Sequence, residues 1–196
     1  MSREARVKRE TAETTIFVRL RLDGSGRASV HTGVGFFDHM LTHVAKHGFL
    51  DLEVTAEGDK EIDDHHLVED VGIVFGQALN EAVGDKRGMV RFGSAMCPLD
   101  EALVTVALDF SGRAHLSYGL ALPTERVGEF DTELALEFFR ALANNARISL
   151  HVVQQAGDNS HHILESAFKS LGRALDQATR RDERVTGIPS TKGTLQ

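Results

Sequence analysis

The sequence has few of the features that mark secreted, membrane-spanning or nucleic-acid-binding proteins. It contains one cysteine, Cys97, so an intrachain disulfide is impossible. No apolar run approaches the roughly 18 residues of a membrane-spanning helix, and the first ten residues, MSREARVKRE, are charged where a secretory signal is apolar. The 22 lysines and arginines are scattered and the net charge is −7, which disfavours a nucleic-acid partner. These absences predict a cytoplasmic protein that binds neither membrane nor nucleic acid.

An internal repeat is the main feature that the sequence does contain. The segment VRLRLDGSGRASVHTG from Val18 matches VTVALDFSGRAHLSYG from Val104 without gaps. Apolar and polar residues alternate on both sides of the shared SGR, which predicts a strand, a tight turn and a second strand, that is, a hairpin at the start of each half. A chain of 196 residues with 41% hydrophobic content can bury the core of one domain made of two such halves.

Two further pairs of segments extend the repeat. FFDHMLTHVAKHGFLDLEV aligns with LALEFFRALANNARISLHV, where helical spacing is followed by a strand, and HHLVEDVGIVFGQAL aligns with HHILESAFKSLGRAL, a long amphipathic helix. Each half therefore reads as strand, strand, helix, strand, helix, in residues 1–95 and 96–182. The pattern predicts an α+β fold by internal duplication, with helices on one face of each sheet. The stretch LALPTERVGEFDTE is extra in the second half, and residues 183–196 are expected to form a mobile or partner-dependent tail.

The paired HHxxE motifs carry the chemistry. Adjacent residues on a helix point about 100° apart, whereas residues four apart diverge by only about 40°, so one motif can supply ligands to two metal ions. Asp63 and Asp64, or Asn159 and Ser160, suit a helix N-cap just ahead of the histidines. We expect one ion to bind His65, Glu69 and His162, and the other to bind His161, Glu165 and His66. The repeat also aligns His39 with Glu137, and we expect His39 to join the second set and Glu137 the first.

A non-metal interpretation exists for each of these residues. A single HHxxE is more often an exposed polar helix face than a metal site, and only its repetition at matched positions favours metal binding. His39 also suits a polar position on a core helix, and Glu137 an exposed one. Imidazole with carboxylate suits Mn, Fe, Zn, Co or Ni, so the donor types leave the metal open. The remaining single histidines are interpreted as ordinary surface or core residues: His31, His43, His115 and His151.

With these motifs, the chain resembles the imidazoleglycerol-phosphate dehydratase family. The resemblance covers nearly the whole chain and is carried by TGVGFFDHML, HG at 47–48, IDDHHLVED, RFG at 91–93, PLDEAL, DFSGR, FFRALANNA, HHILESAFKSLGRAL and IPSTKG. It implies dehydration of imidazole glycerol phosphate to imidazole acetol phosphate in histidine biosynthesis. It also implies a homo-oligomer of about 24 chains, built from trimers with active sites shared between subunits.

The resemblance further implies two divalent ions, usually Mn²⁺, and a set of site residues. The ligands it places are His39, His65, His66, Glu69, His161, His162 and Glu165, whereas some family members have histidine where this chain has Glu137. Glu13 corresponds to a catalytic acid or base. The residues implied to bind substrate, chiefly its phosphate, are His47, Arg91, Arg113, Ser190, Thr191 and Lys192. Arg27 is the repeat counterpart of Arg113 and is interpreted as a turn residue. If both arginines have this structural role, Arg113 is a turn residue too and does not bind the phosphate.

The implied reaction explains the need for two ions. The C–H bond to be broken is not activated by a carbonyl, so a general base alone would face a prohibitive barrier. Two metals, one at each ring nitrogen, would hold the imidazole as its anion, which can expel the neighbouring hydroxyl. Two other functions use similar ligands: a dinuclear metallohydrolase, and a non-enzymatic oligomer that stores or senses metal. Neither needs a phosphate site.

Overall fold

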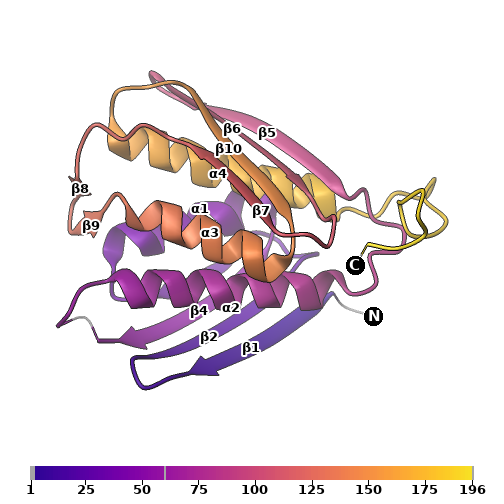
Figure 1. The fold of residues 1–196 in the computed structure, drawn as a ribbon, viewed down its shortest axis with the longest axis horizontal. Helices are drawn as coiled ribbons and strands as arrows, with labels where there is room; N and C mark the ends of the chain where they lie inside the picture. Colours follow the sequence, from indigo (N-terminus) through magenta and orange to yellow (C-terminus); the bar gives the residue numbers. More distant parts are fainter. Residues whose placement is uncertain (1–2, 60, 196) are drawn as a thin grey trace.

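Two four-stranded sheets enclose a layer of four helices (Figure 1). The structure is a computed structural model that describes residues 3–59 and 61–195. Apolar residues from the inner faces of both sheets and from all four long helices form one continuous core. Among the described residues, no helix combines the length and apolarity that crossing a bilayer requires. The α+β duplication with helices on one face of each sheet is thus confirmed.

The first half contains one strand more than the sequence predicts, and its pairing differs. The sheet order is β1-β2-β4-β3, so β4 lies between the two strands that were expected to form a hairpin. β2 pairs antiparallel with β4, and β3 pairs parallel with it. The predicted hairpin is therefore wrong; the hairpin of this half joins β1 to β2. The elements are β1 (Glu4–Glu10), β2 (Thr14–Arg21), β3 (Ala28–His31), α1 (Gly35–Gly48), β4 (Asp51–Gly58) and α2 (His65–Val83).

The second half repeats this topology. Its sheet order is β5-β6-β10-β7, again with the last strand inserted between two earlier ones and parallel to one of them. The extra stretch forms a small two-stranded ribbon, β8 with β9. The elements are β5 (Phe92–Leu99), β6 (Ala102–Asp109), β7 (His115–Gly119), β8 (Arg126–Val127), β9 (Phe130–Asp131), α3 (Leu134–Ala146), β10 (Ser149–Ala156) and α4 (Ser160–Thr179).

The two halves join through helix pairs that cross at small residues. α1 packs on α4 and α2 packs on α3, so each pair takes one helix from each half. A side chain on Gly172 of α4 would place its Cβ 2.6 Å from the Val44 carbonyl oxygen of α1, and one on Gly76 of α2 would place it 2.8 Å from the amide nitrogen of Ala146. Gly76 and Gly172 occupy the same position of the repeat. These close approaches fix how α1 lies against α4, which matters for the site.

Candidate active site

The motif on α4 begins at a capped helix N-terminus. The side-chain oxygen of Asn159 accepts hydrogen bonds from the amides of His161, at 2.9 Å, and His162, at 3.3 Å. This confirms the expected N-cap and places both histidines in the first turn. One turn later, Oε2 of Glu165 lies 3.1 Å from Nε2 of His161.

Helix α1 brings two more histidines to this motif. Nε2 of His39 lies 3.4 Å from Oε2 of Glu165, and Nε2 of His43 lies 3.3 Å from Oε1 of the same carboxylate. The ligand atoms of His39, His43 and Glu165 all lie within 4.8 Å of one another. A close group of imidazole and carboxylate donors suits a divalent transition ion, so these residues fit the expected metal. We call His39, His43, His161 and Glu165 the α4 cluster.

Glu165 is buried yet stays ionised. Burial opposes ionisation of its carboxyl group, but the Lys169 ammonium, 2.6 Å from Oε1, and the neighbouring His43 and His161 outweigh it and hold the pKa of Glu165 at about 2. Burial also lowers the pKa of the His43 imidazole to about 4, so His43 is neutral near pH 7. Near pH 7 the α4 cluster therefore contains a negatively charged carboxylate and a neutral imidazole.

The second histidine of each motif has a carboxylate partner of its own, different from that of the first. The imidazole rings of His65 and His66 lie at 89° to each other, and those of His161 and His162 at 79°. Nδ1 of His66 lies 3.0 Å from the carboxylate of Asp59, and Nδ1 of His162 lies 2.7 Å from the carboxylate of Glu101.

These carboxylates tune and orient the two rings. The hydrogen bond to Asp59 raises the pKa of His66, and the hydrogen bond to Glu101 raises that of His162. A carboxylate on one ring nitrogen orients a histidine to bind metal through the other. Glu13, in the turn between β1 and β2, places Oε2 3.8 Å from Nδ1 of His66, so the candidate acid or base lies beside a candidate ligand.

The motif on α2 is more open. Nε2 of His65 lies 4.0 Å from Oε2 of Glu69, and the side chain of Glu69 is 45% exposed, against 11% for Glu165. In both motifs the rings of the adjacent histidines lie 6.0 Å apart between centroids. In both, the first histidine also lies beside the glutamate four residues later. Near the start of α2, the amide of His65 donates to Asp63 at 2.8 Å.

The expected metal sets are not assembled within one chain. Helices α2 and α4 make few direct contacts, because α1 and α3 lie between them (Figure 1). His65 and Glu69 lie together, as do His39, His161 and Glu165, but among the described residues His162 does not meet the first pair and His66 does not meet the second set. Within one chain, the structure therefore does not bring the residues of the two motifs together. Sharing between subunits stays a prediction.

Glu137 has a different partner from the one expected. Both of its carboxylate oxygens lie within hydrogen-bonding distance of Nη1 of Arg140, at 2.6 and 2.5 Å. No contact in the described part of the chain places it beside His65 or Glu69. A role for Glu137 as a metal ligand stays a prediction.

The residues expected to bind phosphate gather at the opposite end of the molecule. The amide of Arg91 donates to the carbonyl of Ala178, near the C-terminus of α4. Its guanidinium forms a two-pronged ion pair with Asp109, at 2.7 and 3.0 Å, and donates to the Pro189 carbonyl at 2.8 Å. The tail is anchored again where Lys86 donates to the carbonyl of Leu195.

Arg91 therefore holds the tail that carries Ser190, Thr191 and Lys192. Arg113 lies in the loop after β6, whose last residues pair with the start of β5, at this same end of the fold. His47, by contrast, lies on α1, where its ring stacks on that of His43 with 5.6 Å between centroids. It is the one predicted substrate residue beside the α4 cluster.

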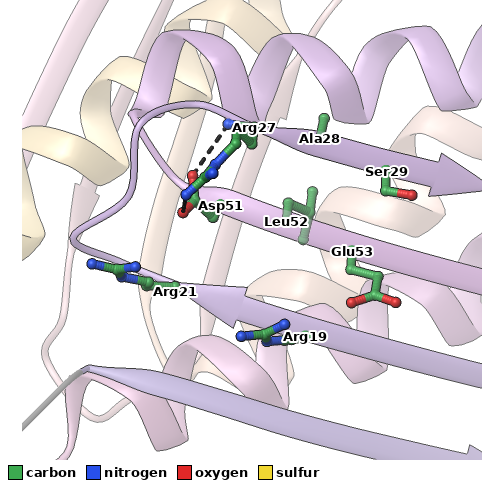
Figure 2. Close-up of a pocket in the computed structure, with 8 residues that line it drawn as sticks. All are labelled: Arg19, Arg21, Arg27, Ala28, Ser29, Asp51, Leu52 and Glu53. Atoms are coloured by element: carbon green, nitrogen blue, oxygen red, sulfur yellow. Dashed lines mark hydrogen bonds and ion pairs between the residues drawn. The ribbon is translucent and has the colours of Figure 1, made fainter.

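A cavity of about 330 Å³ on the outer face of the first sheet does not form part of this site (Figure 2). It contains three arginines, but Arg19 pairs with Glu4 at 2.8 Å and Arg27 with Asp51 at 3.4 Å. Asp51 also accepts from the amide of Arg27, so its carboxylate closes the turn before β3. This agrees with the interpretation of Arg27 as a turn residue.

Four residues that contact the motifs were not predicted from the sequence. His43 was interpreted as an ordinary histidine, and Lys169, Asp59 and Glu101 were not singled out. Two of them carried a usable signal, because His43 follows His39 and Lys169 follows Glu165 by one helical turn. Asp59 and Glu101 lie in loops whose return to the helix N-termini depends on the tertiary fold.

Comparisons with known proteins agree with one another. The family model described as imidazoleglycerol-phosphate dehydratase matches residues 32–175. Curated proteins of that name from Desulforamulus reducens and Moorella thermoacetica are 60% and 57% identical, each over 100% of both chains. The crystal structure of the Staphylococcus aureus enzyme has a TM-score of 0.83 at 41% identity, with 91% of this chain and 99% of that chain covered. A crystal structure from Pyrococcus furiosus in complex with (S)-C348 has a TM-score of 0.84 at 38% identity, with 96% and 100% covered.

Proposed function

Because the chain belongs to the imidazoleglycerol-phosphate dehydratase family, we propose that it dehydrates its substrate with two divalent ions at sites completed between copies of the chain. The activity itself follows from the family: the chain is a hydro-lyase of histidine biosynthesis. The metal dependence, the mechanism and the shared sites form the proposal. Neither a metallohydrolase nor a metal-storing oligomer is supported, since the family is a dehydratase.

The separation of two residue groups along α4 carries the proposal. His162 lies in the first turn of this helix, and Arg91 is hydrogen-bonded to Ala178 near its end. At 1.5 Å per residue these positions are about 24 Å apart along the axis. An imidazole ring, three carbons and a phosphate cannot span that length. If both groups contact one substrate, they must come from different copies of the chain.

Two histidines are well placed to reach a neighbouring copy. His66 and His162 each have a carboxylate partner on Nδ1, which leaves Nε2 as the metal-binding nitrogen. In the proposed site, His39, His161 and Glu165 hold one ion together with His66 of another copy. His65 and Glu69 hold the other with His162 of another copy. Mn²⁺ is the expected ion.

The protein residues then divide the chemistry between them. The bound ions supply Lewis acidity that favours the anionic form of the substrate's imidazole ring. Glu13, beside His66, is placed to move the proton that the reaction removes. His47 contacts the substrate near the α4 cluster. At the other end, Arg91, Arg113, Ser190, Thr191 and Lys192 bind the phosphate, for which guanidinium groups have a matching planar geometry.

A bifunctional ligand tests the proposal. Titration calorimetry of the Mn²⁺-loaded protein with a triazole phosphonate should show tight binding, because its azole meets the ions and its phosphonate meets the arginines. Removing Mn²⁺ by chelation should abolish the azole part and leave weak phosphonate binding. Equal affinity with and without metal would refute the metal-dependent scheme. Failure to complement a histidine-auxotrophic strain would refute the activity.

A further inference from the structure

The carboxylate of Glu165 has two sides with different partners. Oε2 faces the expected ligands, His161 at 3.1 Å and His39 at 3.4 Å. Oε1 faces Lys169 at 2.6 Å and His43 at 3.3 Å. We propose that His43, together with Lys169, is a positioning residue that fixes Glu165 so that Oε2 is presented to a metal ion. This inference rests on the proposed function, because it assumes that Glu165 is a metal ligand.

The packing around His43 supports a fixed orientation. Its side chain is only 17% exposed, and its ring lies between two others on the same face of α1, 4.3 Å from His39 and 5.6 Å from His47 between centroids. Nε2 of His43 lies 3.3 Å from Oε1 of Glu165 and 3.1 Å from Nε2 of His39, so the ring contacts two of the expected ligands. His43 therefore acts on the metal through Glu165, without needing to bind it.

The α2 motif lacks both parts of this device. In the repeat alignment, Ile73 stands where α4 has Lys169, and Ala141 stands where α1 has His43. Glu69, the counterpart of Glu165, is correspondingly more exposed and lies 4.0 Å from His65. A carboxylate held in place loses less conformational freedom when it binds a ligand. The α4 cluster should therefore bind its ion more tightly than the α2 motif binds the other.

Metal titration of three variants tests the inference. Mn²⁺ binding to metal-free protein is followed by the loss of the free-ion electron paramagnetic resonance signal, which resolves two classes of site. His43→Leu should weaken only the tighter class, by about 10- to 100-fold, the usual effect of removing a residue that supports a ligand. His43→Gln, whose amide nitrogen reaches the same position as Nε2, should restore most of that affinity. His151→Gln, on the exposed face of β10, serves as the control and should change neither class.

The outcomes separate this inference from the proposed function. If the wild-type protein binds no Mn²⁺, the proposed function fails as a whole. If it binds two ions and His43→Leu leaves both affinities unchanged, only the positioning role is refuted. Equal weakening of both classes would also refute it, because that result indicates general damage to the fold. Thermal melts of the metal-free variants identify such damage independently.

Discussion

The two HHxxE motifs share a sequence and a place at the start of a long helix, yet the fold surrounds them differently. Glu165 is buried against Lys169 and two histidines of α1, whereas Glu69 is half-exposed with His65 as its neighbour. The extra stretch of the second half, residues 120–133, borders the α4 motif, where the amide of Thr124 donates to Ser160 at 3.0 Å. Duplication therefore kept the HHxxE residues in both halves, while the residues that surround them diverged. The α4 motif is organised within the chain, whereas in the proposed scheme the α2 motif depends more on a neighbouring copy.

The largest expected effect comes from removing a ligand from either motif. His65→Ala and His161→Ala should each lose one of the two ions, and kcat should fall by about 10³-fold, since Lewis-acid stabilisation amounts to several kcal/mol. Elemental analysis and turnover measured on the same samples check this. A variant that keeps full activity with one ion per chain would contradict the two-metal scheme. The two variants would also show whether the motifs contribute equally.

A second pair of variants compares the two SGR turns. Arg113→Ala should raise KM by about 10- to 100-fold, because charge-assisted bonds to a phosphate are worth about 1.5–3 kcal/mol. Arg27→Ala should leave KM unchanged and cost less than about 1 kcal/mol of stability, since Arg27 forms an exposed pair with Asp51. Steady-state kinetics and chemical denaturation measure these changes. Equal effects of the two substitutions on KM would show that the turns had not diverged in function.

A third comparison uses the two equivalent helix crossings. Gly172→Ala and Gly76→Ala should each lower the free energy of unfolding by about 1–3 kcal/mol, because the added methyl group meets backbone atoms of the facing helix. Only Gly172→Ala should also weaken Mn²⁺ binding at the α4 cluster, since it displaces α1 and with it His39 and His43. Mn²⁺ titration separates the two variants. Loss of tight metal binding in Gly76→Ala would contradict the claim that the α1–α4 crossing, and not the α2–α3 crossing, positions the α4 cluster.

The smallest expected effect is on the pH dependence of metal binding. Carboxylate partners raise the pKa of His66 and His162, so protons compete with metal up to a higher pH than at an unperturbed imidazole. Mn²⁺ affinity should therefore fall as the pH drops through these raised values. Asp59→Asn removes the partner that raises the pKa of His66, so the midpoint of Mn²⁺ binding should move to lower pH. A midpoint that stays in place or moves up would show that Asp59 does not control this histidine.

The same pKa shifts determine how the metal-free protein responds to pH. The pair of His66 with Asp59 stabilises the fold fully below the unfolded pKa of histidine, about 6.5. That contribution is lost as the pH rises through the raised pKa of the folded state. Glu165, with a pKa of about 2, contributes above the unfolded pKa of glutamate, and its contribution is lost as the pH falls toward 2.

Local pattern was enough to predict the duplication, the four helices and the place of the two HHxxE motifs at helix starts. The strand order was not predictable in this way, because β3 pairs with β4 across the whole of α1 and nothing in either segment specifies that partner. β1 was missed because five of the seven residues in EARVKRE are charged, and three of these five are exposed on an edge strand. The residues that contact the two motifs were also not predicted, because these contacts depend on how α1 and α3 pack between α2 and α4.

The central claim is that each active site is completed between copies of the chain. The most direct test is to combine two inactive variants in one assembly. Lys192→Glu places a negative charge where phosphate should bind, and His162→Ala removes a ligand at the other end of α4. Each variant alone should be inactive at low substrate concentration. Assemblies formed by co-expressing both should regain activity, because some of their sites take the intact His162 from one chain and the intact Lys192 from the other. Mixed assemblies as inactive as either variant alone would contradict shared sites and require both groups to act within a single chain.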